Sequence, residues 1–262
     1  MILKSVLVVS SLSLVFGLAL AYFARRFQVK SQPLVEQIRK ILPGANCGSC
    51  GLAGCDAFAE AVVAGKLPVN ACIVGQDEIA QKIAAILGKN SPEKTDKKLS
   101  VLHCNGTSDN CSKRPYHGIQ TCKGANLLHG NKDCVYACLG FGDCVKVCPV
   151  GCITMQDNGI PEVDRKNCVS CGKCVETCTK DLFELVPADK KVHVSCSSKD
   201  LGKEVIKVCR VGCIGCGSCE RACPSDAIHV IDNIAQINYS NCINCGKCAK
   251  VCTRKIIVNQ NL

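Results

Sequence analysis

The sequence contains no tryptophan, and aromatic residues make up only 4% of its 262 residues. Large buried rings usually dominate a core of this size, so an aromatic core is not what holds this fold together. The sequence also lacks a phosphate-binding loop and a G-x-G-x-x-G pattern after a strand, and no side chains form a nucleophile–base pattern. No nucleotide site and no catalytic residue are therefore predicted in this chain.

Cysteine is abundant instead, with 26 residues, far above ordinary usage. A secreted disulfide scaffold and an intracellular metal protein both fit that count. The cysteines occur in tight runs, and a disulfide between neighbours such as Cys171 and Cys174 would close almost no loop. The runs therefore predict metal binding, which can supply the folding free energy that an aromatic-poor core does not.

The formal net charge is +10, which by itself suggests an anionic partner. However, lysine and arginine are scattered rather than clustered, which argues against nucleic acid. Each iron–sulfur cubane bound by four thiolates would add roughly −2, so five of them would offset the excess. The basic residues are interpreted as internal compensation.

The strongest motif is C-x2-C-x2-C-x3-C, which occurs at 168–178, 213–223 and 242–252. Three thiolates in one short loop cap three corners of a [4Fe–4S] cubane, and the fourth ligates the neighbouring cluster. Zinc usually takes two spaced cysteine pairs, which suits these runs poorly. The crossing rule predicts three ligand sets: Cys213, Cys216 and Cys219 with Cys252; Cys242, Cys245 and Cys248 with Cys223; and Cys168, Cys171 and Cys174 with Cys148.

The motifs belong to an internal repeat, because 167–178 recurs as 241–252. The repeat aligns Phe141 with Cys216, so one site lacks its regular ligand. Cys134 is the predicted substitute, which gives Cys134, Cys138 and Cys144 with Cys178. Cys134 also aligns with Cys209, so an alternative leaves three cysteines and a [3Fe–4S] cluster there.

Two further groups of cysteines lie outside the repeat motifs. Glycines interleave with the thiols of a fifth predicted site, Cys47, Cys50, Cys55 and Cys72, for which zinc remains an alternative. Six cysteines are then left over: Cys104, Cys111, Cys122, Cys152, Cys196 and Cys209. A sixth cluster on Cys104, Cys122, Cys196 and Cys209 is one hypothesis, and small buried thiols are the other.

An apolar segment without charge covers residues 5–24, long enough for a transmembrane helix. Arg25 and Arg26 follow it, which predicts a cytoplasmic location for the rest of the chain; a cleaved signal peptide is the alternative. The predicted class is α+β, with a transmembrane helix, a small helical [4Fe–4S] domain and two tandem bacterial-type 2[4Fe–4S] ferredoxin-like modules. The predicted boundaries are 1–30 for the anchor, 31–92 for the helical domain with helices at 35–42, 57–64 and 79–87, 93–133 for a linker and cysteine-containing segment, 134–187 for module 1, 188–208 for a connecting segment and 209–262 for module 2.

The layout resembles the long, many-cluster form of the B subunit of Rnf ion-translocating electron-transport complexes. Three runs carry this resemblance behind the N-terminal segment: I-L-P-G-A-N-C-G-S-C-G from Ile41, C-L-G-F-G-D-C-V-K-V-C-P from Cys138, and V-C-R-V-G-C-I-G-C from Val208. Cys111 and Cys152 are not positions associated with the family, and Cys152 is interpreted as a buried spare thiol.

The resemblance implies a subunit of an ion-translocating ferredoxin:NAD oxidoreductase at the cell inner membrane. The chain would take electrons from soluble ferredoxin and relay them to partner subunits that hold the flavins, the nicotinamide site and the Na+ or H+ path. A membrane-anchored polyferredoxin serving a hydrogenase or reductase is the alternative, and a zinc-rich interaction module is a third.

Overall fold

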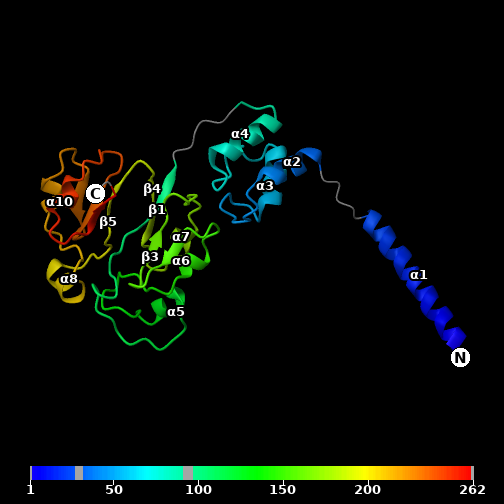
Figure 1. The fold of residues 1–262 in the computed structure, drawn as a ribbon, viewed down its shortest axis with the longest axis horizontal. Coiled ribbons are helices and arrows are strands. Elements are labelled where there is room, and N and C mark those ends of the chain that lie inside the picture. The colour runs from blue at the N-terminus through cyan, green and yellow to red at the C-terminus, as the bar shows by residue number, and fades with distance from the viewer. Residues whose placement is uncertain (1, 27–31, 91–96, 261–262) are drawn as a thin grey trace.

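The computed structural model describes residues 2–26, 32–90 and 97–260. Three parts follow one another along the chain: a long N-terminal helix, a small helical unit, and a part with both helices and strands that carries most of the cysteines (Figure 1). The mixed helix and strand content predicted from the sequence is therefore confirmed.

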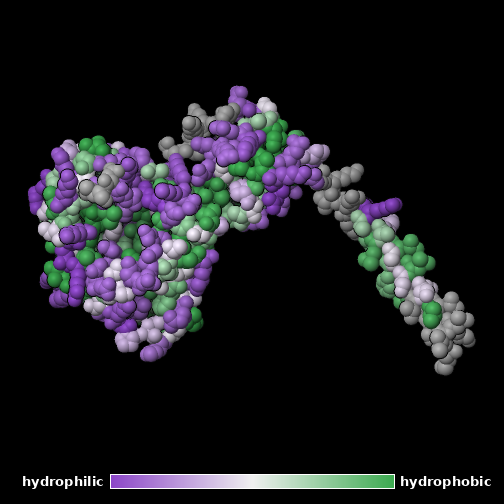
Figure 2. Space-filling view, viewed as in Figure 1, coloured by the Kyte–Doolittle hydropathy of each residue, from purple (hydrophilic) through white to green (hydrophobic). Residues whose placement is uncertain are grey.

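The N-terminal helix, α1, covers Ile2–Arg26. Large apolar side chains such as Leu18 and Leu20 are exposed on it, and apolar residues alternate with paler ones along its length in Figure 2. Within the described part of the chain, no helix combines the length and the apolarity needed to cross a membrane. The transmembrane anchor predicted over residues 5–24 is therefore not supported; Ser10, Ser11 and Gly17 interrupt its apolar run.

The helical unit consists of α2 (Pro33–Ile41), α3 (Cys55–Val63) and α4 (Gln76–Ile86). Each helix begins two or three residues before its predicted start and ends one residue before its predicted end. Ile38, Phe58 and Ile83, one from each helix, are fully or almost fully buried at the centre of the unit. The polar linker predicted after α4 lies largely outside the described residues.

The remaining part contains two similar halves. In the first, the hairpin β2 (Ile153–Met155) and β3 (Pro161–Val163) accompanies short helices α6 (Asp143–Lys146) and α7 (Lys173–Thr177). In the second, the hairpin β6 (Ile228–Ile231) and β7 (Ile234–Ile237) accompanies α9 (Ser218–Arg221) and α10 (Lys247–Val251). The repeat seen in the sequence is thus also a repeat of structure.

Each half also has a second strand pair. In the first half, β1 (Lys98–Leu102) pairs antiparallel with β4 (Phe183–Pro187), and Leu102 lies opposite Phe183. In the second, β5 (Val192–Val194) pairs with β8 (Ile257–Asn259), and Val194 lies opposite Ile257. The segments predicted as a linker and a connector therefore supply the first strand of each half.

Two helices have no counterpart in the hairpin units. The helix α5 (Cys122–Leu127) lies between β1 and α6, and α8 (Gly202–Val208) lies between β5 and α9. The chain between β1 and α6 is much longer than the chain between β5 and α9, so the first half carries an insertion.

The four short helices α6, α7, α9 and α10 begin in the same way. Each follows a glycine in the left-handed region, with φ of 74°, 76°, 70° and 68° at Gly142, Gly172, Gly217 and Gly246. A side chain at these positions would be strained, because only glycine adopts this conformation readily. A cysteine stands two residues after each glycine, so the turn fixes where that thiol lies.

Candidate metal centres

The first centre lies in the helical unit. Cys47, Cys50, Cys55 and Cys72 all line one cavity of ≈ 360 Å³. Cys55 opens α3, and its backbone N–H donates to Asn46 Oδ1 at 2.9 Å. Gly54 passes so close that an added Cβ would stand 3.0 Å from the same Asn46 oxygen. The structure therefore brings together the four cysteines predicted for this site.

A second cavity of ≈ 390 Å³ lies in the first half of the repeat. Its lining includes four cysteines: Cys122, Cys138, Cys144 and Cys178. Three of these were predicted to share a site, but the fourth was expected to be Cys134, which is not in the lining. Cys122 takes that place from the insertion, at the first position of α5.

Two contacts hold Cys122 against this cavity. Its backbone N–H donates to Asp143 Oδ2 at 2.8 Å, and Asp143 is the first residue of α6. Thr121 caps α5, because its side-chain oxygen accepts from the backbone N–H of Gly124 at 3.0 Å. The start of α5 is thus tied to the helix that carries Cys144.

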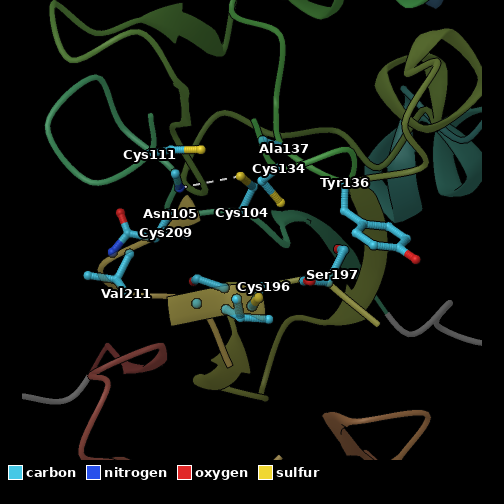
Figure 3. A pocket seen from close by; sticks show the side chains of 15 residues that line it. Cys104, Asn105, Cys111, Cys134, Tyr136, Ala137, Cys196, Ser197, Cys209 and Val211 are labelled. Atoms are coloured by element: carbon cyan, nitrogen blue, oxygen red, sulfur yellow. Dashed lines mark hydrogen bonds between the residues drawn. The ribbon is translucent and has the colours of Figure 1, made fainter. Parts of the chain in front are cut away.

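A third cavity of ≈ 360 Å³ lies where the two halves meet. The cysteines in its lining are Cys104, Cys111, Cys134, Cys196 and Cys209. Figure 3 shows Cys104 and Cys134 close together on one side and Cys196 on the other. Three of the four cysteines proposed for a sixth site are therefore brought together here, with Cys134 in the place expected for Cys122.

The regular motif cysteines are embedded in the apolar clusters of their halves. Cys168 and Cys174 are buried beside Leu99 and Phe183, and the Cys174 sulfur lies 3.1 Å from Ser100 Oγ. Cys213 and Cys219 are buried beside Ile228. In contrast, Cys216 and Cys245 are exposed, so the second half presents cysteine to its surroundings.

One surplus thiol lies beside a motif cysteine rather than in a cavity of its own. The Cys152 sulfur is 3.5 Å from that of Cys148, and Cys152 is buried. Burial, with Cys148 next in effect, raises the pKa of Cys152 well above its usual range. Cys152 is therefore a protonated neighbour of a predicted ligand, as the spare-thiol interpretation requires.

Burial has a common electrostatic effect on the cavity cysteines. It raises the pKa of Cys138, Cys144 and Cys196 to about 12, and neighbouring cysteines raise each pKa further. The pKa of Cys134 rises to about 11 for the same reasons. Thiolates at such positions repel one another and lack solvent, so a cationic iron core is what would stabilise them.

The arrangement also bears on the kind of metal. Among the residues that the structure describes, no three His, Cys, Asp or Glu side chains converge as they would around one metal ion. A cubane instead places its four thiolates on four different irons, around the cluster. Cavities of several hundred Å³ ringed by cysteines fit that second arrangement.

Comparison with known families supports iron–sulfur clusters at both ends of the cysteine-rich region. A family described as "Putative Fe-S cluster" matches residues 42–74, which contain the first centre. A family described as "4Fe-4S dicluster domain" matches residues 212–256, which contain the motif cysteines of the second half.

Three relatives resemble most of the chain, and each is the B subunit of a membrane redox complex. That of the Na(+)-translocating ferredoxin:NAD(+) oxidoreductase complex of Acetobacterium woodii is 43% identical over 91% of this chain and 72% of its own length. That of the ion-translocating oxidoreductase complex of Methanosarcina acetivorans is 40% identical over 90% of both chains. That of the proton-translocating ferredoxin:NAD(+) oxidoreductase complex of Clostridium ljungdahlii is 41% identical over 91% of this chain and 85% of its own.

Proposed function

Since the chain belongs to the family of B subunits of ion-translocating oxidoreductase complexes, we propose that it is the electron-relay component of such a complex. In this role it moves electrons between reduced ferredoxin and NAD, and the complex couples that transfer to the movement of Na+ or H+. The chain itself carries no bond chemistry. Its cysteines hold a series of [4Fe–4S] clusters, each of which accepts and releases one electron.

The observation that carries this proposal is the set of cysteine-lined cavities. The first and second have nearly equal volumes, ≈ 360 and ≈ 390 Å³, and each is lined by four cysteines. With the three regular motifs they make five proposed clusters in one chain. A row of one-electron centres without a substrate pocket between them is what a relay needs.

The two ends of the relay differ in exposure. Cys216 and Cys245 are exposed in the second half, and Arg221 and Lys247 beside them are exposed too. A soluble donor with an acidic surface, such as ferredoxin, would be attracted there. We assign electron uptake to this half and exchange with the membrane partners to the Cys47 centre.

The location at the membrane is part of the proposal, with the iron–sulfur domains on the cytoplasmic side. The exposed apolar side chains of α1 call for an apolar partner, such as a lipid surface or a membrane subunit. Cell fractionation tests this location. Full recovery of the complete chain in the soluble fraction, without other subunits, would contradict it.

The experiment that tests the relay is a substitution in the intact complex. Purified anaerobically from membranes, the complex with Cys47→Ala is expected to lose ferredoxin-driven NAD reduction while ferredoxin still reduces the clusters of the second half. A matched control is Cys152→Ala, which removes a thiol that is not in the relay. Normal turnover of the Cys47 variant would overturn the assignment, and a chain that purifies with a hydrogenase instead would favour a polyferredoxin.

A further inference from the structure

The cysteines around the third cavity form two equivalent pairs, one from each half of the repeat. Cys104 stands two residues after β1, and Cys196 stands two residues after β5. Cys134 and Cys209 each stand four residues before the first motif cysteine of their half, Cys138 and Cys213. The junction is therefore built from the same two positions used twice.

The hydrogen bonds at these positions repeat as well. The backbone N–H of Cys138 donates to Cys104 Sγ at 3.4 Å, and that of Cys213 donates to Cys196 Sγ at 3.3 Å. Because Cys138 and Cys213 are themselves predicted ligands, the junction cavity is tied to a centre in each half.

The four cysteines share a feature with the regular motif cysteines. At Cys104, Cys134, Cys196 and Cys209, the sulfur receives a backbone N–H from the residue two positions further along the chain, namely Gly106, Tyr136, Ser198 and Val211. Cys171 and Cys216 of the regular motifs have the same arrangement, with Lys173 and Ser218. Such N–H groups stabilise negative charge on sulfur and tune a cluster.

Cys111, the fifth cysteine of the lining, lacks these features. It lies in the insertion and has no equivalent in the second half, and its backbone donor is Cys134 rather than Lys113. Its thiol donates to the carbonyl oxygen of Ser112 at 3.8 Å, a contact that requires its proton. Cys111 is therefore a thiol beside the cavity and not part of the repeated set.

We propose that Cys104, Cys134, Cys196 and Cys209 bind a sixth [4Fe–4S] cluster at the junction, and that Cys122 replaces Cys134 as the fourth ligand of the Cys138, Cys144 and Cys178 site. The cavity has the same ≈ 360 Å³ as the first centre. The set differs from the sequence-based hypothesis by exchanging Cys122 and Cys134. The insertion supplies Cys122 where the repeat has Phe141 instead of a cysteine.

The position gives the sixth cluster a role as a bridge between the halves. A reduced neighbour in one half returns from the 1+ to the 2+ state as the bridge goes from 2+ to 1+, and the bridge then passes the electron to the other half. No bond or proton is exchanged. This bridging role rests on the relay function proposed above, whereas the ligand set does not.

Iron content tests the site without any activity measurement. The full-length chain, purified anaerobically, is expected to contain about 24 iron atoms, and Cys104→Ala combined with Cys196→Ala is expected to reduce this to about 20. Cys111→Ala is the matched control, because it lines the same cavity, and about 24 irons are expected. About 20 irons in the unsubstituted chain, or no loss in the double variant, would overturn the proposal.

The exchange of ligands is tested in the double variant, which has no bridging cluster left to lose. Adding Cys134→Ala is expected to remove no further iron, whereas adding Cys122→Ala should remove up to about four more. The opposite pattern would return Cys134 to the site of Cys138, Cys144 and Cys178. If a variant fails to fold, the iron count of the unsubstituted chain still decides for or against a sixth cluster.

Discussion

Asp143 Oδ2 accepts hydrogen bonds from the backbone N–H groups of Cys122 at 2.8 Å and of Lys123 at 3.3 Å. The carboxylate thus lies at the positive end of α5 and at the start of α6. Side chains far apart in the sequence are fixed to each other by this one group, and it decides whether Cys122 reaches the second cavity.

Asp143→Ala is therefore expected to loosen the second centre. The substitution removes a charged acceptor of two hydrogen bonds, which weakens the docking of α5 by about 2 kcal/mol. The measurement is the rate at which a chelator removes iron from the anaerobic protein. Lys146→Ala is the control, since it removes only the ion pair that Asp143 makes at 3.6 Å; equal rates in both variants would show that the hydrogen bonds do not matter.

Gly140→Ala is expected to destabilise the loop that carries Cys138 and Cys144. Gly140 has φ of 78°, and an added Cβ would stand 2.7 Å from the carbonyl oxygen of Gly159, which is backbone and cannot turn aside. Strain and clash together should lower the free energy of unfolding by about 2 to 4 kcal/mol. Denaturant unfolding under anaerobic conditions measures this.

The matched control for the glycine is Gly151→Ala. Gly151 has φ of 63° but open space around its added Cβ, so only the backbone strain of about 1 to 2 kcal/mol remains. The difference between the two variants isolates the contact with Gly159. A loss as large for Gly151 as for Gly140 would contradict the assignment of that contact.

His193 should make stability depend on pH. It lies buried on β5, and burial, with His103 and Arg165 next, lowers its pKa to about 4. The unfolded chain keeps a histidine pKa near 6.5, so between pH 6.5 and about 4 the unfolded state binds more protons. The free energy of unfolding is then expected to fall as the pH is lowered, by at most about 1.4 kcal/mol per pH unit.

Denaturant unfolding at pH 7.5, 6.5 and 5.5 measures the effect of His193. His193→Gln, which cannot take up the proton, should flatten the decrease below pH 6.5. His117→Gln at an exposed histidine should leave it unchanged. The same pH dependence in all three proteins would assign it to other groups.

Removal of the N-terminal helix should leave the clusters in place. A chain that starts at Gln32 keeps every residue that lines the three cysteine cavities, because the first of them is Leu42. We expect this shortened chain to be brown and to bind as much iron as the full chain. A colourless or aggregated product would show that α1 contributes to folding.

The sequence predicted the first centre because its ligands are close together and glycines mark the turns between them. It also predicted the three helices around that centre, from the spacing of residues such as Ile38 and Ile83. The regular motifs were equally accessible, since three of four ligands lie in one short loop. In these regions the information is local, and the fold adds only the burial.

The sequence did not reveal which cysteine completes the second cavity. Aligning the halves showed that Phe141 replaces a ligand, but a substitute can come from any segment that the fold brings near. Cys134 was the nearest candidate along the chain, whereas Cys122 reaches the cavity through Asp143 and the turn of α5. Likewise, the pairing of β1 with β4 depends on contacts across about 80 residues, which no local pattern encodes.

The strand pairs β1–β4 and β5–β8 have a consequence for the ancestry of the chain. Each half begins and ends with a strand of its own pair, so each half closes on itself, and both offer the same cysteine pair to the shared junction. Identical patches that meet in this way are the hallmark of a twofold homodimer interface. The present chain therefore has the architecture of two fused protomers, and a single half produced alone would carry half a binding site that only a second copy could complete.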